Sequence, residues 1–470
     1  MPTLPHFKRR RAQFLEAIDT PVLLMAGGRL SRNYPANWYP FRADSTFQFF
    51  FPEPEPGAAA LFDPEDGSVT LFLAERTPED ALWHGSQPSF DDMKQGLSVT
   101  AVQKRADLAA LVHKKVGKRR LSALAVHDPK ATATAAEISG QQLDFFAADK
   151  IGDPKLIAAL AKLRLRRDPE ELQEMRSCAA VTREAHVVAM AKTRPGLYEQ
   201  DLVGHVEGTF ARHGCVPAYN TILTVRGEVL HNNAHGNMLL DTDIVLLDGG
   251  AENKSGYCAD VTRCWPVNGH FSPEARDVYE IVLAAEKAAI EAVKPGVRYR
   301  DIHLLGARII TEGLVSMGLM KGDIDKLVDA GAHALFFPHG IGHLLGLDVH
   351  DMEGFGDQVH YAKGRKRSDQ FGLAYLRLDL DLQAGMCFTI EPGVYFVPAM
   401  IHHAEFRKKF KGMVDFTRAE SFLTMNSLRG FGGIRIEDNV HCTPSGAEVL
   451  TAAIPKERVA VEALVGSAGG

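Results

Sequence analysis

From residue 244 the chain reads Ile244-Val245-Leu246-Leu247-Asp248, and twelve residues after Asp248 it reads Asp260-Val261-Thr262-Arg263-Cys264-Trp265. These strand-like segments flank Asn253–Gly256, whose composition favours a turn. A hairpin symmetric about Lys254 would place Asp248 and Asp260 roughly opposite each other, on the order of 5 Å apart. Two facing carboxylates at the end of a buried strand repel, so either one is protonated or a cation lies between them. Solvated loop aspartates are the simpler alternative, which the four apolar residues before Asp248 disfavour.

Two glutamates end similar short segments further along the chain. Glu391 follows Phe388-Thr389-Ile390, and Glu437 follows Gly433-Ile434-Arg435-Ile436. A charged side chain at the end of an apolar or alternating strand needs a partner, because burial without one is costly. A single Glu-Pro-Gly turn, as at Glu391, means little by itself. These acids become informative only beside the two aspartates.

Histidines and glycines are interleaved between these acids, in Pro338–His343 and Gly346–Asp351. His339 and His343 are four residues apart, as in a zinc-binding helix, but the glutamate of the HExxH motif is missing and the glycines disfavour a helix. Any one of the nineteen histidines, taken alone, is more often structural. Because glycines let the backbone approach a ligand closely, the clustering favours a site.

The four acids and one histidine offer mostly oxygen donors with one nitrogen. Such a set suits a hard cation such as Mn²⁺ better than a zinc site built from thiolates. Four carboxylates would also neutralise two divalent cations. The residues therefore indicate a metal site composed of Asp248, Asp260, His343, Glu391 and Glu437.

The length of 470 residues exceeds what a single core usually supports, so we expect two domains. Residues 1–160 alternate helix-like stretches with strand-like ones and predict a small α/β domain. The helical stretches are 6–18 and 106–116, and the strand-like ones are Val22–Met25, Phe47–Phe51, Val69–Leu73 and Leu121–Val126. A long helix should then begin after Asp168, which can cap it together with Glu171. The second domain is expected to span residues 161–470.

The second domain contains a repeat one hundred residues apart. Thr193–Leu197 and Val293–Val297 each carry a Pro-Gly pair, followed a few residues later by Asp201 in one copy and Asp301 in the other. In both copies a helix should end at Pro-Gly and another should start after it. Two chance turns are the alternative. A duplicated unit would give an α+β domain with internal pseudo-symmetry and a site in the cleft between its halves.

Charge and cysteine usage limit the partners and the compartment. A formal net charge of −6 argues against nucleic-acid binding. The six cysteines include no CxxC pair, so we expect reduced thiols and a cytoplasmic protein. No run of 18 apolar residues exists, and no signal-type apolar stretch follows the basic residues Lys8–Arg11. We therefore predict no membrane association.

Five spaced motifs resemble those of the pita-bread metallopeptidases, and within them the proline-specific branch of prolidase and aminopeptidase P. Residues 1–160 are similar to the N-terminal domain of that branch, so the resemblance covers nearly the whole chain. It implies an α/β N-terminal domain, an α+β pita-bread catalytic domain, and hydrolysis of Xaa-Pro bonds by a homo-oligomer, a dimer or higher. The motifs are Leu247–Gly250, Ala259–Arg263, His339–His343, Thr389–Gly393 and Gly433–Glu437.

The resemblance also implies a role for each residue. Asp248 would bind one divalent ion, His343 and Glu391 the other, and Asp260 and Glu437 would bridge the two, which we expect to be Mn²⁺. Glu391 would in addition handle the proton of the attacking water. Further catalytic or substrate contacts are implied for His231, His339, His350 and Arg435.

Three departures from the family pattern leave every expected ligand in place. The spacing from Asp248 to Asp260 is one residue longer than expected, at the turn near Lys254, and this could alter the hairpin register. Asn232-Asn233 replace an aromatic residue after His231, and Met352-Glu353 follow Asp351 where valine and glycine would be more familiar.

Dipeptidase and aminopeptidase are the two activities to separate. The segment around Arg377 resembles the prolidase pattern in which an arginine binds the free carboxylate of a dipeptide, and residues 396–429 also resemble prolidase. Arg377 as a solvated charge is the alternative. The sequence thus favours an Xaa-Pro dipeptidase over an Xaa-Pro aminopeptidase. A binding protein that has lost catalysis would usually lack ligands, and a creatinase-like enzyme, which needs no metal, would leave the four acids unexplained.

Overall fold

The computed structural model describes residues 5–425 and 429–468. The chain forms two compact units, one of Met1–Leu165 with Met352–Val359 and one of Arg166–Asp351 with His360–Gly470. Helix α13 (Asp357–His360) begins in the 352–359 segment of the first unit. No helix among the described residues is long and apolar enough to cross a membrane.

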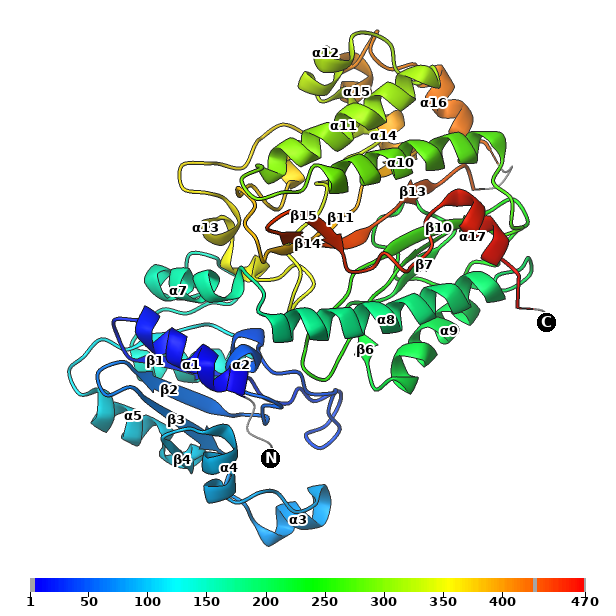
Figure 1. Ribbon diagram of the computed structural model, residues 1–470. Helices are drawn as coiled ribbons and strands as arrows, with labels where there is room; N and C mark the ends of the chain where they lie inside the picture. The colour runs from blue at the N-terminus through cyan, green and yellow to red at the C-terminus, as the bar shows by residue number, and fades with distance from the viewer. Residues whose placement is uncertain (1–4, 426–428, 469–470) are drawn as a thin grey trace. The chain divides into compact units, whose positions relative to one another are not determined.

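The first unit is built on a mixed five-stranded sheet in the order β4-β3-β2-β1-β5. β1 pairs antiparallel with β2 and β2 with β3, whereas β3–β4 and β1–β5 are parallel. The strands are β1 (Val22–Met25), β2 (Ala59–Asp63), β3 (Ser68–Leu73), β4 (Ala101–Lys104) and β5 (Ser122–Ala123). The helices are α1 (Pro5–Ala17), α2 (Ser45–Phe50), α3 (Pro78–His84), α4 (Phe90–Leu97), α5 (Leu108–Val116), α6 (Pro129–Ser139) and α7 (Pro154–Arg164). Figure 1 shows these strands and helices in blue to cyan.

Both faces of this sheet are buried, as the apolar strands require. Leu61 packs with side chains of α5 and α6 on one face, and the next residue, Phe62, meets Phe14 and Phe50 on the other at ring distances of 5.0 and 5.2 Å. The prediction of a strand over Phe47–Phe51 is wrong, because this run forms helix α2. Asp44 caps that helix by accepting the N–H of Thr46 at 2.9 Å, and the aromatic side chains are buried all round rather than on alternate faces.

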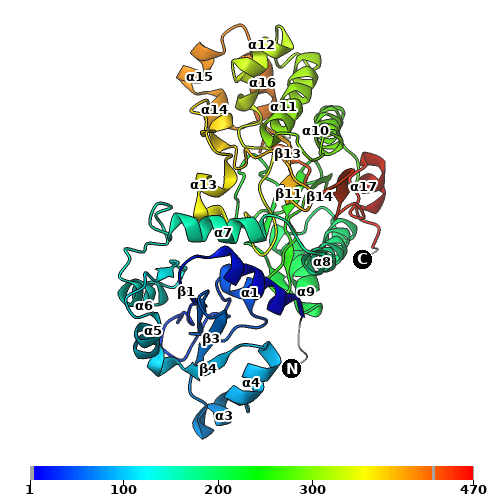
Figure 2. The ribbon, with the colours of Figure 1, turned by 60° about the vertical axis from the view of Figure 1, so that its left-hand side comes forward.

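The second unit has strands between two helix pairs, α8–α9 and α10–α11, as both ribbon views show (Figures 1 and 2). The helices are α8 (Pro169–Lys192), α9 (Glu199–Arg212), α10 (Pro273–Glu291), α11 (Tyr299–Ser316), α12 (Ile324–Asp329), α14 (Pro398–Ile401), α15 (Ala404–Lys409), α16 (Phe416–Leu423) and α17 (Arg458–Leu464). As predicted, α8 begins after a capping box in which Asp168 and Glu171 each accept the other's backbone N–H at 2.9 Å.

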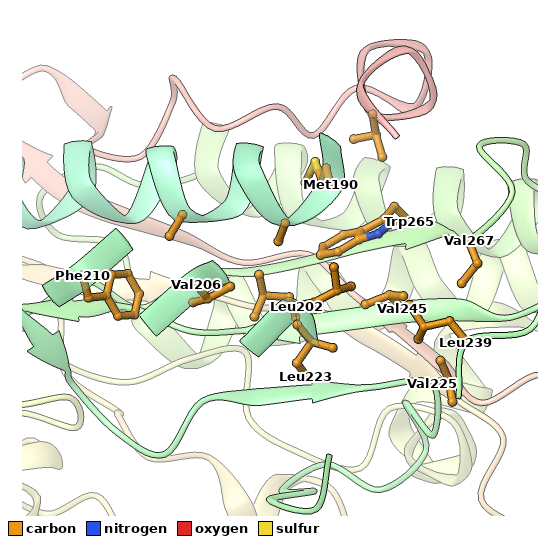
Figure 3. Close-up of a cluster of buried hydrophobic side chains, with 14 of the residues drawn as sticks. Met190, Leu202, Val206, Phe210, Leu223, Val225, Leu239, Val245, Trp265 and Val267 are labelled. Carbon is orange, nitrogen blue, oxygen red and sulfur yellow. The ribbon is translucent and has the colours of Figure 1, made fainter. Parts of the chain in front are cut away.

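The strands of this unit form four small sheets, ordered β10-β8-β7, β11-β14-β15, β12-β13 and β6-β9. They are β6 (Val216–Pro217), β7 (Ile222–Thr224), β8 (Ile244–Asp248), β9 (Ala251–Glu252), β10 (Thr262–Pro266), β11 (Cys387–Ile390), β12 (Gly393–Tyr395), β13 (Gly433–Arg435), β14 (Asp438–Thr443) and β15 (Gly446–Val449). Figure 3 shows Trp265 of β10 and Val245 of β8 packed beneath Met190 of α8 and beside Leu202 and Val206 of α9.

The predicted pseudo-symmetry is present in the backbone. Gly196 and Gly296 have φ angles of 89° and 88°, a region that only glycine enters at no steric cost. The N–H of Gly196 donates to Leu239 at 2.9 Å, and that of Gly296 donates to Leu382 at 2.8 Å. Three residues further on, α9 and α11 begin at equivalent positions, Glu199 and Tyr299. Each helix pair therefore makes the same backbone contact with a later segment of the chain, near residue 239 in the first half and near residue 382 in the second.

The hairpin of β8 and β10 has a different register from the predicted one. Asp248 pairs with Thr262 rather than with Asp260, so the turn is centred one residue later than Lys254. The turn sets this register: the N–H of Asn253 donates to the carbonyl of Tyr257 at 3.0 Å, and Gly256 has a φ angle of 83°. The shift also fits the longer spacing noted in the sequence. Because the offset along the partner strand is two residues, Asp260 stays on the same face as Thr262, and the two aspartates become diagonal neighbours.

Candidate active site

All ten residues singled out from the sequence line one cavity of about 620 Å³ in the second unit. Five are the expected ligands and five are the expected catalytic or substrate contacts. The cavity also has apolar walls, including Ile222, Leu230, Phe371 and Met400, as small-molecule sites usually do. The ten residues are Asp248, Asp260, His343, Glu391, Glu437, His231, His339, His350, Arg377 and Arg435.

Asp260, His343 and Glu437 form the closest group, with one oxygen or nitrogen of each within 4.8 Å of the others. The Nδ1 of His343 lies 3.0 Å from the carbonyl of Leu344, which assigns the ring proton to Nδ1. Nε2 then faces the carboxylates, 3.2 Å from Asp260 and 3.8 Å from Glu391. A backbone contact that fixes the tautomer in this way is the usual arrangement around a metal-binding histidine.

Asp248 and Asp260 are joined by Tyr219, whose hydroxyl lies within hydrogen-bond distance of both carboxylates. The other oxygen of Asp248 accepts Nη2 of Arg435 at 2.6 Å. Burial raises the pKa of Asp248 even against that guanidinium. The two carboxylates therefore converge as predicted, although on a diagonal of the hairpin and through a tyrosine.

A second chain of hydrogen bonds fixes Glu437 and Arg435. Nε of Arg435 donates to Oγ1 of Thr262 at 2.9 Å, and that hydroxyl donates to Glu437 at 2.8 Å. Nη1 of Arg435 donates to the hydroxyl of Tyr395 at 3.0 Å, which lies 2.8 Å from Nε2 of His339. Burial lowers the pKa of His339 to about 3, so its ring is neutral at physiological pH.

The charge balance of the cavity indicates a need for cations. Burial raises the pKa of Glu391 to about 7 and raises that of Glu437 well above its ordinary value. Burial acts the same way on Asp260, but His343, Tyr219 and His350 together outweigh it through hydrogen bonds and charge, and the pKa of Asp260 is lowered. Four carboxylates thus share a buried space in which Arg435 contacts only Asp248 directly. Their oxygens, together with Nε2 of His343, fit hard divalent cations, which would offset the repulsion.

The metallopeptidase family M24 model matches residues 173–444, which is more than half of the chain. The chain belongs to metallopeptidase family M24. The model of the aminopeptidase P N-terminal domain matches residues 7–124 of this M24 peptidase. The predictions of the pita-bread fold and of the proline-specific branch are therefore confirmed.

The relatives of this M24 peptidase include both proline-specific activities. It is 31% identical to an Xaa-Pro aminopeptidase of Haemophilus influenzae, over 97% of this chain and 96% of the relative. It is 32% identical to the Xaa-Pro dipeptidase of Homo sapiens, over 94% and 88%. The structure of Pseudomonas aeruginosa aminopeptidase PepP superimposes with a TM-score of 0.81 at 30% identity, over 100% and 99% of the chains. Zinc-substituted Escherichia coli aminopeptidase P in complex with product gives 0.80 at 28%, over 99% of each.

Four residues that hold the site together were not predicted from the sequence of this M24 peptidase: Tyr219, Thr262, Tyr395 and Asn439. The amide of Asn439 holds the backbone of Asp260 from both sides, accepting its N–H at 3.1 Å and donating to its carbonyl. Only Thr262 carried a signal, because it lies two residues after Asp260 and so on the same strand face. Tyr219, Tyr395 and Asn439 reach the site only through tertiary contacts.

The metal-stripped enzyme should lose stability as pH rises from about 4.5 to 7. The raised pKa of Glu391, about 7 against an ordinary 4.5, means that the folded state holds this proton more tightly than the unfolded chain. The protonated carboxyl group contributes fully to the free energy of unfolding below pH 4.5. Between pH 4.5 and 7 this contribution falls by about 1.4 kcal/mol per pH unit, about 3 kcal/mol in all. Urea unfolding of chelator-treated wild type and Glu391→Gln measures it, because glutamine keeps the neutral form. A stability difference between them that does not change with pH would contradict this assignment.

Proposed function

We propose that this M24 peptidase hydrolyses Xaa-Pro peptide bonds with two divalent cations, for which Mn²⁺ is our first choice. The observation that carries the proposal is the convergence of the five expected ligands in one buried cavity with Arg377 at its wall. The relatives named for Xaa-Pro cleavage support the substrate class. The proposal keeps residues 1–160 as the N-terminal domain and 161–470 as the catalytic domain.

In this proposal Asp248 would hold one cation, His343 and Glu391 would hold the other, and Asp260 and Glu437 would contribute to both. Bound cations would polarise the scissile carbonyl and make water acidic enough to act as a nucleophile at neutral pH. The anchored side chains restrict where cations can lie: Asp260 is held through Asn439, and Glu437 through Thr262. Pre-organised ligands of this kind bind without first having to be ordered.

Glu391 is the proposed proton carrier. It is the most exposed of the four carboxylates, at 19% of its side chain, so it can reach a water in the cavity. Without bound cations, burial raises its pKa to about 7, so the carboxyl group can hold a proton in this cavity. Glu391 would take a proton from the attacking water and deliver it to the proline nitrogen as the bond breaks.

Histidines and arginines of the cavity are proposed to bind the substrate. His350 stacks on His343 with ring centroids 3.7 Å apart, which brings it next to the ligand group. His231 and the neutral His339 line the same cavity and can hydrogen-bond the peptide. Donors aimed at the oxygen that gains charge stabilise the tetrahedral intermediate, and His231 and His350 are the proposed donors.

We favour the dipeptidase over the aminopeptidase because of Arg377. If its guanidinium binds the free carboxylate of a dipeptide, Arg377→Ala should lower kcat/KM on an Xaa-Pro dipeptide by about 30- to 150-fold, the loss of about 2 to 3 kcal/mol. An Xaa-Pro-Yaa tripeptide has an amide at that position and should be affected much less. The measurement is kcat/KM of both enzymes on both substrates, with manganese added.

Equal losses on the two substrates would mean that Arg377 supports the fold or the metal site instead. The aminopeptidase is the second candidate, because the N-terminal domain model and the structures compared above are those of aminopeptidase P. A wild-type preference for the tripeptide would favour it. Metal binding without turnover of either substrate would favour a non-catalytic relative.

A further inference from the structure

Glu199, the first residue of α9, is a fully buried acid that lies outside the cavity lining. Its carboxylate accepts the N–H of Val225 at 2.8 Å through one oxygen and the N–H of Asn237 at 3.0 Å through the other. The side-chain amide of Asn237 adds contacts of 3.0 Å to both oxygens. A buried carboxylate with this many N–H partners is a strong anchor, because each hydrogen bond to a charged acceptor is stronger than a neutral one.

The two backbone groups that Glu199 holds are the two ends of one loop, residues 225–237. This loop, which starts after β7, contributes Leu230, His231 and Asn233 to the cavity wall. One side chain therefore closes a loop that carries a proposed substrate-binding histidine. Closing a loop costs chain entropy. Because Glu199 joins the loop ends in the folded protein, this entropy is lost on folding and not on substrate binding.

Further contacts give the closed loop a defined shape. The amide of Asn232 donates to Oγ1 of Thr224 at 3.0 Å, and Nδ1 of His235 lies 3.2 Å from the carbonyl of Leu223. Near its start the loop lies directly on the first residue of β13, since a Cβ on Gly227 would be 2.6 Å from the carbonyl oxygen of Gly433. The ends of the loop are thus tied to Glu199, and its middle is tied to β7.

Comparison of the two pseudo-symmetric halves shows that the backbone at position 199 does not itself require an acidic residue. Tyr299 is the equivalent of Glu199 in the second half, and its N–H donates to Leu380 at 2.9 Å, as that of Glu199 donates to Asn237 at 3.0 Å. The hydroxyl of Tyr299 instead donates to the carbonyl of Thr389 in β11, at 2.7 Å. The shared backbone contact forms with either side chain. The carboxylate at 199 is therefore explained by the loop it closes.

We propose that Glu199 is a positioning residue that holds loop 225–237 in the conformation that presents His231 to the substrate. The proposal rests on the proposed function for the role of His231, but the clamp itself is a property of the loop. In Glu199→Gln an NH₂ group replaces one acceptor oxygen, so it must face the N–H of either Val225 or Asn237 and leaves that donor unpaired. The loop should open at that end.

Hydrogen exchange measured by mass spectrometry on the full-length, metal-loaded enzyme tests the clamp. Peptides that cover 225–237 should exchange at least about 10-fold faster in Glu199→Gln, while β8 and the rest of α9 keep wild-type rates. Asp201→Asn is the matched control, because it makes the same acid-to-amide change in the first turn of the same helix but contacts Tyr198 instead of the loop. Asn237→Ala, which removes the amide contacts and leaves Glu199 in place, is the second variant if Glu199→Gln folds poorly.

A double-mutant cycle with His231→Ala then tests the route of the effect. Glu199→Gln alone should lower kcat/KM on an Xaa-Pro dipeptide by about 10-fold with bound metal unchanged, and should add little in the His231→Ala background. Unchanged exchange in the loop, or losses that multiply in the double variant, would overturn the proposal. If the wild-type enzyme does not cleave Xaa-Pro substrates at all, the proposed function fails, and the exchange result still decides whether Glu199 holds the loop.

Discussion

Asp260→Asn is expected to lower kcat/KM on an Xaa-Pro dipeptide by at least about 10³-fold, because a metal ion contributes several kcal/mol to the stabilisation of the transition state. The neutral amide would leave the two cations poorly neutralised, so at least one should be lost. Asp260 is buried and central, since its carboxylate meets both His343 and Tyr219. Bound metal, measured by plasma mass spectrometry after dialysis, and kcat/KM should fall together.

Asp243→Asn is the matched control for this change. Asp243 is also buried and immediately precedes β8, the strand that pairs with β10. It accepts Arg429 at 2.7 Å and the N–H of Leu240 at 2.9 Å, away from the cavity. Its loss should lower the unfolding midpoint but leave the metal stoichiometry unchanged. An Asp260→Asn enzyme that keeps both ions and near-normal turnover would disprove the bridging role.

Glu391→Gln should lower kcat by at least about 10²-fold, the usual contribution of a positioned acid or base. Glutamine keeps the shape and an oxygen donor but cannot carry the proton, so part of the metal should remain bound. The experiment is single-turnover hydrolysis of an Xaa-Pro dipeptide at saturating substrate and saturating manganese, which separates chemistry from binding. An unchanged rate with intact metal would show that Glu391 serves only to hold the structure.

The convergence of the four acids could be predicted from sequence, because Asp248, Glu391 and Glu437 end short apolar or alternating segments and Asp260 opens another. An unpaired charge at such a position is costly. The strands β8, β11 and β13 all deliver their acids to one cavity, as the pattern suggested. Local pattern did not determine the register between β8 and β10. The turn that closes at Asn253 and Tyr257 places Asp248 opposite Thr262, and its exact length could not be read from its composition.

Residues that support the site could not be predicted, because they reach it from distant parts of the chain. Tyr219 precedes β7 and contacts two aspartates on β8 and before β10, and Tyr395 of β12 contacts Arg435 of β13. Nothing in the local sequence of a buried tyrosine distinguishes such a role from core packing. The wrong strand over Phe47–Phe51 has a related cause. Buried aromatic residues suit either a strand or a helix, and the cap provided by Asp44 decides for α2.

The most direct test of the central claim is a titration of the metal-stripped enzyme with Mn²⁺, in which bound metal and hydrolysis of an Xaa-Pro dipeptide are measured on the same samples. The site described here predicts about two ions per chain at saturation and negligible turnover before metal is added, with activity rising as the ions bind. Full activity in the stripped enzyme, or two bound ions with no cleavage of either the dipeptide or an Xaa-Pro-Yaa tripeptide, would contradict it.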